Sequence, residues 1–405
     1  MTKNDDKRIP ALRFKGFNDD WAQQELKDLV SFYSGLTYHP EDIKSTGVFV
    51  IRSSNIKHGQ LVNADNVYVD PKSVNSTYVR KKDIIVVVRN GSRNLIGKHA
   101  QVHNDISKSV IGAFMTGIRS NNNDFISALF DSDKFRKEIH KNLGATINQI
   151  TTGEFKKMIF PTPQTLNEKE KIGNLISQIN SLVSLQQRKE KILKQIQQAI
   201  YYNIYPEYGT KIPIIRHREF NKDWSIVSFN KLYKKSKEKN DLTYGEDKII
   251  SVAKMYFKHE SQNSSKDYLK TYNVFKKGDI AFEGNRSEGF SHGRFVQNNI
   301  GDGIVSHVFD VFTPLKKENL NYWKYAIHNE HIMKYILVKS TTKATMMNNL
   351  STKDFLKQKI AVPNSREMKK ISHLLKRLDD QLEFSKRKIK LLTKVKQFLL
   401  QNMFI

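Results

Sequence analysis

IPALRFKGFNDDW (residues 9–21) is repeated later in the chain as IPIIRHREFNKDW (residues 212–224). Seven of the thirteen positions are identical without a gap, all at an offset of 203 (212 − 9 = 203). The identical pairs are Ile9/Ile212, Pro10/Pro213, Arg13/Arg216, Phe17/Phe220, Asn18/Asn221, Asp20/Asp223 and Trp21/Trp224. Identity this dense is hard to obtain by chance, so the stretch predicts an internal duplication.

The duplication extends beyond the opening motif. VRKKDIIVVV (residues 79–88) matches FKKGDIAFEG (residues 275–284), and each reads as a basic turn that leads into a strand through Asp83 or Asp279. TTGEFKKMIFPTP (residues 151–163) matches STKDFLKQKIAVP (residues 351–363). The offset drifts between matches, which indicates loops of different length on one repeated architecture.

A long amphipathic helix is predicted after each of these proline-terminated strands. Apolar residues follow a four-three rhythm over residues 172–204 and again over 371–403, without any proline. The predicted seam residues are Ile172, Ile176, Ile179, Val183, Leu193, Ile371, Leu375, Leu378, Leu382 and Leu392. Each helix could cover its own domain, but the stripe is longer than an average globular helix and favours packing of the two helices on each other as a coiled coil.

These elements predict an α/β (α+β) two-fold repeat with pseudo-twofold architecture. We expect a globular segment at residues 1–158, a helical segment at 159–208, a second globular segment at 209–358 and a second helical segment at 359–405. A twofold relation makes the helices antiparallel. A helix over residues 172–204 is about 50 Å long, enough to hold two DNA-reading segments a helical turn or more apart.

The charge balance points to a polyanionic partner. The chain carries 68 Lys and Arg against 41 Asp and Glu, a formal charge of +27. No apolar stretch approaches the roughly 20 residues of a membrane span, and MTKNDDKRIP (residues 1–10) lacks a signal-peptide core. With no cysteine, the simplest expectation is a cytoplasmic protein without disulfides or thiolate metal sites, and the scattered histidines predict no metal site.

Polar and basic residues alternate with strand-like runs at corresponding places of the two globular segments. In the first these are FVIRSSNIKHG (49–59), VVRNGSRNLIGKH (87–99) and LGATINQITTGEF (143–155). In the second they are SVAKMYFKHE (251–260), EGNRSEGFSHGRF (283–295) and STTKATMMNNLST (340–352).

Arginine can read guanine and asparagine adenine, while lysine mostly holds phosphates. The candidate DNA contacts are Arg52, Asn55, Lys57, Arg89, Asn90, Arg93, Lys98, Asn148, Lys254, Asn285, Arg286, His292, Arg294, Lys343 and Asn348.

Catalytic signatures are absent from the sequence. There is no Pro-Pro pair for an amino-methyltransferase motif and no phosphate-binding loop for ATP. Glu246, Asp247 and Lys248 are adjacent, but they read as a surface turn. We therefore expect a non-catalytic adaptor that brings the chemistry of other subunits to a defined DNA sequence.

The repeated P-x-(L/I)-R-x-x-x-F-x-x-D-W opening, the KKxDI strand and the run from Phe155 or Phe355 through proline into a Lys-rich helix resemble the specificity (S) subunit of Type I restriction-modification systems. The resemblance covers both halves in order. It implies that each globular segment is a target recognition domain and that the helices form the spacer. The family's usual Glu-Gln pair at the helix start appears here as NEKEK (167–171) and SREMKK (365–370).

The resemblance also implies partners and cofactors. Double-stranded DNA and two modification (methyltransferase) subunits would bind this chain, and restriction/translocase subunits would complete the assembly. S-adenosylmethionine, ATP and Mg²⁺ would belong to those partners, and this chain would bind no cofactor. One alternative is the specificity component of a Type IIB or fused restriction enzyme. Another is a coiled-coil scaffold that does not bind DNA.

Overall fold

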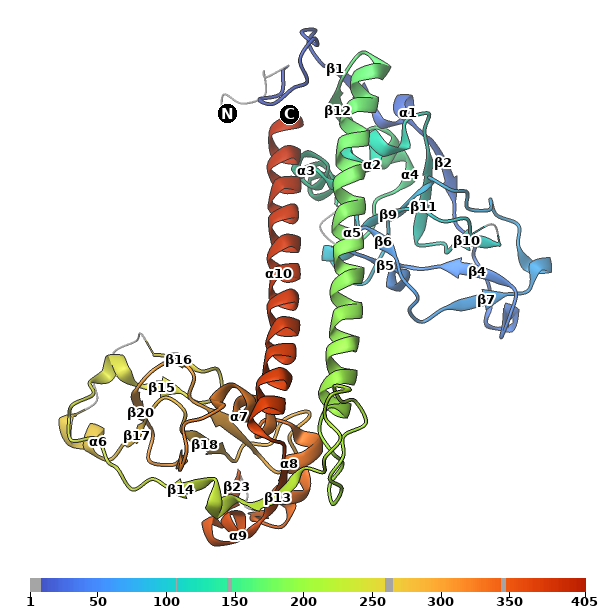
Figure 1. Ribbon diagram of the computed structural model, residues 1–405. Coiled ribbons are helices and arrows are strands. Elements are labelled where there is room, and N and C mark those ends of the chain that lie inside the picture. Colours follow the sequence, from blue (N-terminus) through green and yellow to red (C-terminus); the bar gives the residue numbers. More distant parts are fainter. Residues whose placement is uncertain (1–8, 107, 144–147, 259–264, 344–346) are drawn as a thin grey trace. The chain divides into compact units, whose positions relative to one another are not determined.

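The computed structural model describes residues 9–106, 108–143, 148–258, 265–343 and 347–405. They form two compact units. The first contains the described residues up to Arg188 together with Arg387–Ile405, and the second is Lys189–Lys386. Two long helices, α5 (Leu166–Asn203) and α10 (Ser365–Met403), each contribute to both units (Figure 1). The first unit is therefore built from two separate stretches of the chain, whereas the second is one continuous stretch.

An antiparallel sheet in the order β2-β11-β8-β9 forms the centre of the first unit. Its strands are β2 (Ser31–Ser34), β11 (Met115–Arg119), β8 (Ile84–Val87) and β9 (His99–Gln101). Every residue of β8 is buried, because the strand is central and shares its core with α2 (Asn123–Asp131) and α3 (Asp133–Asn142). The continuous apolar run that begins at Ile84 is thus a core strand.

Smaller strands complete the first unit. A second sheet has the order β10-β4-β7-β3, in which β10 and β4 are parallel. These strands are β10 (Ser109–Ile111), β4 (Val48–Ile51), β7 (Val67–Val69) and β3 (Ile43–Lys44), and a hairpin joins β5 (Ile56–Lys57) to β6 (Gln60–Leu61).

The second unit repeats the central sheet in the order β14-β21-β18-β19. Its strands are β14 (Tyr233–Lys235), β21 (Asp310–Pro314), β18 (Ile280–Glu283) and β19 (Arg294–Gln297), followed by α7 (Leu320–Ala326) and α8 (Glu330–Val338). Ile280 pairs with Phe312 as Ile84 pairs with Ile118, so the register is repeated as well. The predicted α/β (α+β) two-fold repeat is confirmed.

The halves differ in their smaller strands. The second unit has the two-stranded sheets β17 (Asn273–Phe275) with β20 (Gly303–Val305), β15 (Ile250–Ser251) with β16 (Tyr256–Phe257), and β22 (Thr341–Lys343) with β23 (Asn348–Leu350). The common frame therefore carries different secondary structure in the two halves.

The repeated KKxD turn has one structural role in both halves. The carboxylates of Asp83 and Asp279 accept the backbone N–H of Arg80 and Lys276, each at 2.9 Å, and so close the turn before the core strand. In the first unit Arg119 also binds Asp83 through two hydrogen bonds of 2.9 Å. Asp279 has no such arginine among the described residues, and burial raises its pKa to about 6.

Both long helices begin with a side-chain cap, at corresponding positions of the two halves. Thr165 accepts the N–H of Glu168 at 3.4 Å, and Asn364 accepts the N–H of Glu367 at 2.9 Å. The strands before them, β12 (Ile159–Thr162) and β24 (Lys359–Val362), pair with β1 (Ala22–Glu25) and β13 (Ser225–Ser228). Residues 159–162 and 359–362 are therefore strands of the globular parts, and the helices begin after them, at Leu166 and Ser365.

The duplicated opening stretch closes onto the first turn of the helix. Arg13 donates to both carboxylate oxygens of Glu168, at 2.7 and 2.9 Å, and the Trp21 indole N–H donates to the same carboxylate at 3.3 Å. The Glu168 side chain is 1% exposed and that of Arg13 is 10% exposed. The arrangement is a buried, bidentate ion pair with an additional donor.

The second unit contains the same arrangement of an arginine, a tryptophan and a helix-start glutamate, which we call the clamp. Arg216 donates to Glu367 at 2.8 and 2.9 Å, and Trp224 donates at 3.2 Å. The repeat thus preserves the residues that fasten each globular part to the start of a long helix. The acidic residue also sits in the first helical turn, where the helix dipole favours a negative charge.

In each unit a segment of α5 packs against a segment of α10. In the first unit Ile172 and Ile176 share a core with Leu400 and Met403; in the second, Gln197 donates to Asp379 at 2.6 Å. Residues early in α5 thus meet residues late in α10, which makes the packed segments antiparallel. Both helices also enter the cores of the globular parts. The two packing modes considered from the sequence therefore occur together.

The ten predicted seam residues are buried or half-buried. The buried ones are Ile172, Ile176, Ile179, Ile371, Leu375 and Leu382, and the half-buried ones are Val183, Leu193, Leu378 and Leu392. The polar interruptions Gln186 and Ser385 are buried too. Across the described parts of the chain, no helix is both long and apolar enough to cross a membrane.

Candidate nucleic-acid interface

Three loops of the first unit meet in one place, which we call the first loop cluster (residues 52–57, 89–98 and 148–150). The Asn90 side-chain amide donates a hydrogen bond to the Ser53 hydroxyl, and the Lys98 ammonium donates one to the Ser53 backbone carbonyl, both at 3.1 Å. The Asn148 side chain donates to the carbonyl of Gly91 at 2.9 Å. The first three predicted stretches therefore converge; residues 144–147 of the third lie outside the described residues.

Exposed cations occupy the surface of the first loop cluster. Lys57 and Arg89 are exposed, and neither side chain has a hydrogen bond or ion pair to another described residue. Arg93 is exposed as well, and its guanidinium donates to the carbonyl of Leu143 at 3.4 Å. The Arg89 guanidinium lies 4.9 Å from the centre of the Phe114 ring. Such a surface can bind phosphates and present donors to base edges.

Other predicted contacts support the first loop cluster from within. The Asn55 side chain is fully buried and donates to the carbonyl of Ala64 at 2.6 Å, so Asn55 is an interior residue and not an accessible base contact. Arg52 is held by Asp65. Burial, followed by the charge of Lys57, lowers the pKa of Lys98.

The second unit brings its three predicted stretches together in the same way, as the second loop cluster (residues 251–258, 283–294, 340–343 and 347–350). Arg294 donates to Glu283 at 2.6 Å and to the carbonyl of Ala253 at 3.2 Å. Arg286 donates to the Asn348 side chain at 3.3 Å, and the Asn348 backbone N–H bonds Gly284 at 2.9 Å. Residues 259–264 and 344–346 lie outside the described residues.

The predicted contacts of the second unit also divide by accessibility. Lys254, Asn285 and Lys343 are exposed, and their side chains make no hydrogen bond or ion pair within the described chain. His292 is half-buried in the same cluster. Asn348 is only 5% exposed and holds the loops together, so it is an interior residue like Asn55.

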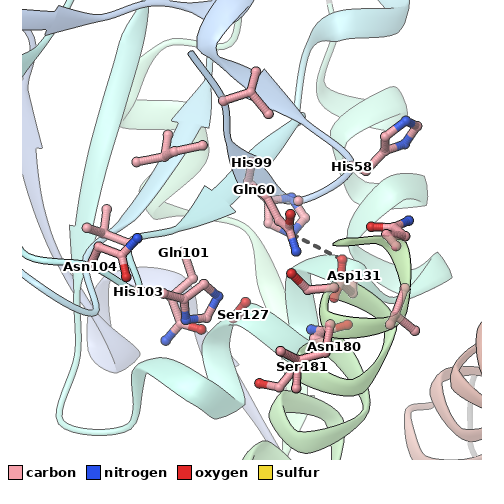
Figure 2. A pocket seen from close by; sticks show the side chains of 18 of the residues that line it. His58, Gln60, His99, Gln101, His103, Asn104, Ser127, Asp131, Asn180 and Ser181 are labelled. Atoms are coloured by element: carbon pink, nitrogen blue, oxygen red, sulfur yellow. Dashed lines mark ion pairs between the residues drawn. The ribbon is translucent and has the colours of Figure 1, made fainter. Parts of the chain in front are cut away.

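A cavity of about 820 Å³ lies beside the first loop cluster, where β9, α2 and the helices meet. Figure 2 shows His99 and Asp131 turned toward one another beside Asn180 and Ser181 of α5. His99 lies 3.4 Å and Lys396 of α10 lies 2.7 Å from the Asp131 carboxylate. Burial opposes ionisation of Asp131, but these two partners hold its pKa well below the ordinary value.

The contacts of Asp131 fasten the first globular part to α10. In the chain as described, no three His, Cys, Asp or Glu residues are grouped so as to hold a metal ion. Glu246, Asp247 and Lys248 lie on a turn whose last two residues are exposed.

Each long helix exposes an apolar stripe on the side away from the seam. Phe384 and Leu391 of α10 are both 62% exposed, far more than core leucines and phenylalanines. Their counterparts at an offset of 199 (384 − 185 = 199) are Leu185 and Ile192 of α5. The apolar stripes comprise Leu185, Ile192, Ile196, Phe384, Leu391 and Val395. Each helix therefore carries an exposed apolar surface at corresponding positions of the repeat, larger than scattered single residues would give.

Sequence reasoning missed one residue of the first loop cluster and the buried glutamates at the two helix starts. Phe114 lies in a short turn of mixed composition, and nothing in the sequence places it beside Arg89. Glu168 and Glu367 were recognisable, since both fall at the offset of 199 that relates the two helices (367 − 168 = 199). A comparison of charged residues along the helix alignment would have found them.

Comparison with known proteins finds one family in both halves of the repeat. The family model described as "Type I restriction modification DNA specificity domain" matches residues 18–197 and, a second time, residues 206–394. The Type I restriction enzyme EcoKI specificity subunit of Escherichia coli (strain K12) is 28% identical over 195 residues, or 45% of this chain and 42% of that protein. The StySPI specificity subunit of Salmonella potsdam is 27% identical over the same shares. These matches span less than half the length of either relative.

A solved structure shares the whole fold. The S subunit of a Type-I restriction-modification system from M. genitalium aligns over 98% of this chain and 99% of its own, with a TM-score of 0.61 at 14% identity. At that identity the likeness shows a common fold, including both globular parts and both long helices.

Proposed function

Because the chain belongs to the Type I restriction modification DNA specificity family, we propose that it is the DNA-reading subunit of a Type I restriction-modification complex. Each loop cluster reads one half of a two-part DNA target. The observation that carries this proposal is the pair of loop clusters, built at corresponding places on one repeated frame and each presenting exposed cations.

The two half-sites differ in sequence under this proposal. Lys57 and Arg89 are exposed in the first loop cluster, where the second presents Lys254, Asn285 and Lys343. Different side chains at corresponding places read different bases. The target is therefore asymmetric and not a palindrome.

The helices set the distance between the half-sites. α5 has 38 residues and α10 has 39. At 1.5 Å per residue each is about 57 Å long. Successive major-groove segments of B-DNA recur about every 34 to 36 Å, so helices of this length suit a target with an unread spacer.

Partner subunits supply the chemistry. Two modification subunits dock on the apolar stripes and methylate adenine with S-adenosylmethionine, and restriction/translocase subunits add ATP- and Mg²⁺-dependent cleavage. This chain is non-catalytic and binds none of those cofactors. Support for two equivalent partners comes from the equivalent positions of the two stripes.

Salt dependence of DNA binding tests the proposal against the coiled-coil scaffold. We expect the affinity of the complex with its modification subunits for DNA to fall roughly thousandfold or more between about 50 and 200 mM salt, because several phosphates are contacted. Lys57→Ala should lower the slope by about one unit, and Lys72→Ala, an exposed lysine outside both loop clusters, should not.

An affinity for DNA that is weak and unchanged by salt would favour the scaffold. The Type IIB or fused-enzyme alternative predicts the same salt slope. That alternative requires a partner that carries the catalytic residues and cleaves without a separate translocase. The subunit composition of the purified complex therefore distinguishes it from the Type I assembly.

A further inference from the structure

We propose that Arg89 and Phe114 form one reading unit for a guanine next to a thymine in the half-site of the first unit. Arg89 bonds the guanine edge, and the Phe114 ring covers the thymine methyl group. This inference rests on the proposed function, since it names bases read by the first loop cluster. It concerns the major groove of double-stranded DNA.

The backbone fixes Phe114 next to Arg89. Phe114 lies in the turn between β10 and β11, and its carbonyl accepts the N–H of Val88 at 3.0 Å and that of Arg89 at 3.2 Å. Phe114 is 52% exposed, although most phenylalanines of this chain lie in its cores. The two side chains thus leave neighbouring strand ends and reach the same surface.

The Arg89 guanidinium is available to bind a group outside this chain. It lies 4.9 Å from the centre of the Phe114 ring, a distance typical of a cation-π contact. No carboxylate of the described chain pairs with it, whereas Arg52 is bound to Asp65 and Arg119 to Asp83. A guanidinium that lies over a ring keeps its N–H edge available for hydrogen bonds.

The chemistry of the pair suits one base step. Arginine makes two hydrogen bonds to guanine O6 and N7, and apolar groups including phenylalanine contact the thymine methyl in the major groove. Because the side chains are in contact, the bases they reach must be adjacent. The first half-site therefore contains a G·C pair beside an A·T pair.

Among the described residues of the second unit there is no equivalent pair. Arg294 lies 5.2 Å from the centre of the Phe290 ring, but its guanidinium is bound to Glu283 at 2.6 Å and is half-buried. The Arg294 guanidinium is therefore already bound to a carboxylate within the protein. Substitutions at Arg89 and Phe114 should change one half-site and leave the other unchanged.

The test compares methylation motifs in a host that expresses the modification subunits with wild-type or variant chain. We expect Arg89→Lys to relax the guanine position roughly tenfold, because lysine keeps the charge but loses the planar two-bond contact. Phe114→Ala should relax the adjacent thymine position. Ile43→Ala and Arg136→Ala, exposed apolar and basic residues of the same unit, should leave the motif unchanged.

Replacing thymine by uracil, which lacks the methyl group, tests the contact directly. With the purified complex, uracil at the assigned position should weaken wild-type binding about fourfold, the effect of one buried methyl group. The Phe114→Ala complex should bind both DNAs equally. A wild-type half-site with no G·C pair beside an A·T pair, or variants with the wild-type motif, would overturn the inference and leave the proposed function intact. If wild-type chain produces no two-part motif, both fail.

Discussion

Glu168→Gln is expected to destabilise the first unit by about 3 to 5 kcal/mol, the usual cost of removing one partner from a buried ion pair. Arg13 would keep its charge at a side chain only 10% exposed, and Trp21 would face a weaker acceptor. Hydrogen exchange followed by mass spectrometry at increasing urea concentration measures the loss, because it reports the free energy of opening for each unit separately. Glu367→Gln should have the same effect in the second unit.

Two further variants isolate the ion pair from general disruption. Glu170→Gln alters an exposed carboxylate at the start of the same helix and should change stability by less than about 0.5 kcal/mol. The double variant Arg13→Met with Glu168→Gln should lose clearly less than the sum of the single losses, because neither then leaves an unpaired buried charge. Strictly additive losses would show that the clamp does not act as a pair.

Ile192→Asp and Leu391→Asp are each expected to remove one of two bound modification subunits. These residues occupy corresponding positions of the two apolar stripes (391 − 192 = 199) and are exposed, so a charge there should leave the fold intact. A carboxylate buried in an apolar interface without a partner should weaken that contact roughly thirtyfold or more. Native mass spectrometry of the purified complex counts the bound subunits.

The stoichiometry makes the docking experiment decisive. Each single variant should yield one tightly bound modification subunit, and the double variant should yield none. Gln195→Asp and Gln397→Asp place the same charge at exposed polar positions of the same helices and should keep both subunits bound. Two subunits on the Ile192→Asp, Leu391→Asp double variant would place the docking surface elsewhere.

Local sequence signals predicted the repeated frame because the same residues perform the same structural task twice. Arg13 and Trp21 reappear as Arg216 and Trp224 because both pairs bind a helix-start glutamate. Asp83 and Asp279 recur because each closes a turn before a core strand. The order of strands in the sheets was beyond prediction, since β11 pairs with β2 and β8 across long stretches of chain and no local pattern encodes such partners.

The candidate interface was predicted at the level of loops and less well at the level of residues. Polarity alone cannot separate an asparagine that faces solvent, such as Asn285, from one that joins loops from inside, such as Asn55 or Asn348. Arg294 was predicted to contact DNA because of its charge, but its guanidinium forms an ion pair with Glu283. Phe114 was missed because its exposure and its contact with Arg89 depend on strand pairing.

The most direct test of the central claim is a base-resolution map of adenine methylation in a host that supplies the modification subunit, with and without this chain. The account predicts a split, non-palindromic motif that appears only when the chain is present and that gives both half-sites and the spacer. If the complex forms but no new motif appears, the chain does not direct recognition, and the account is contradicted.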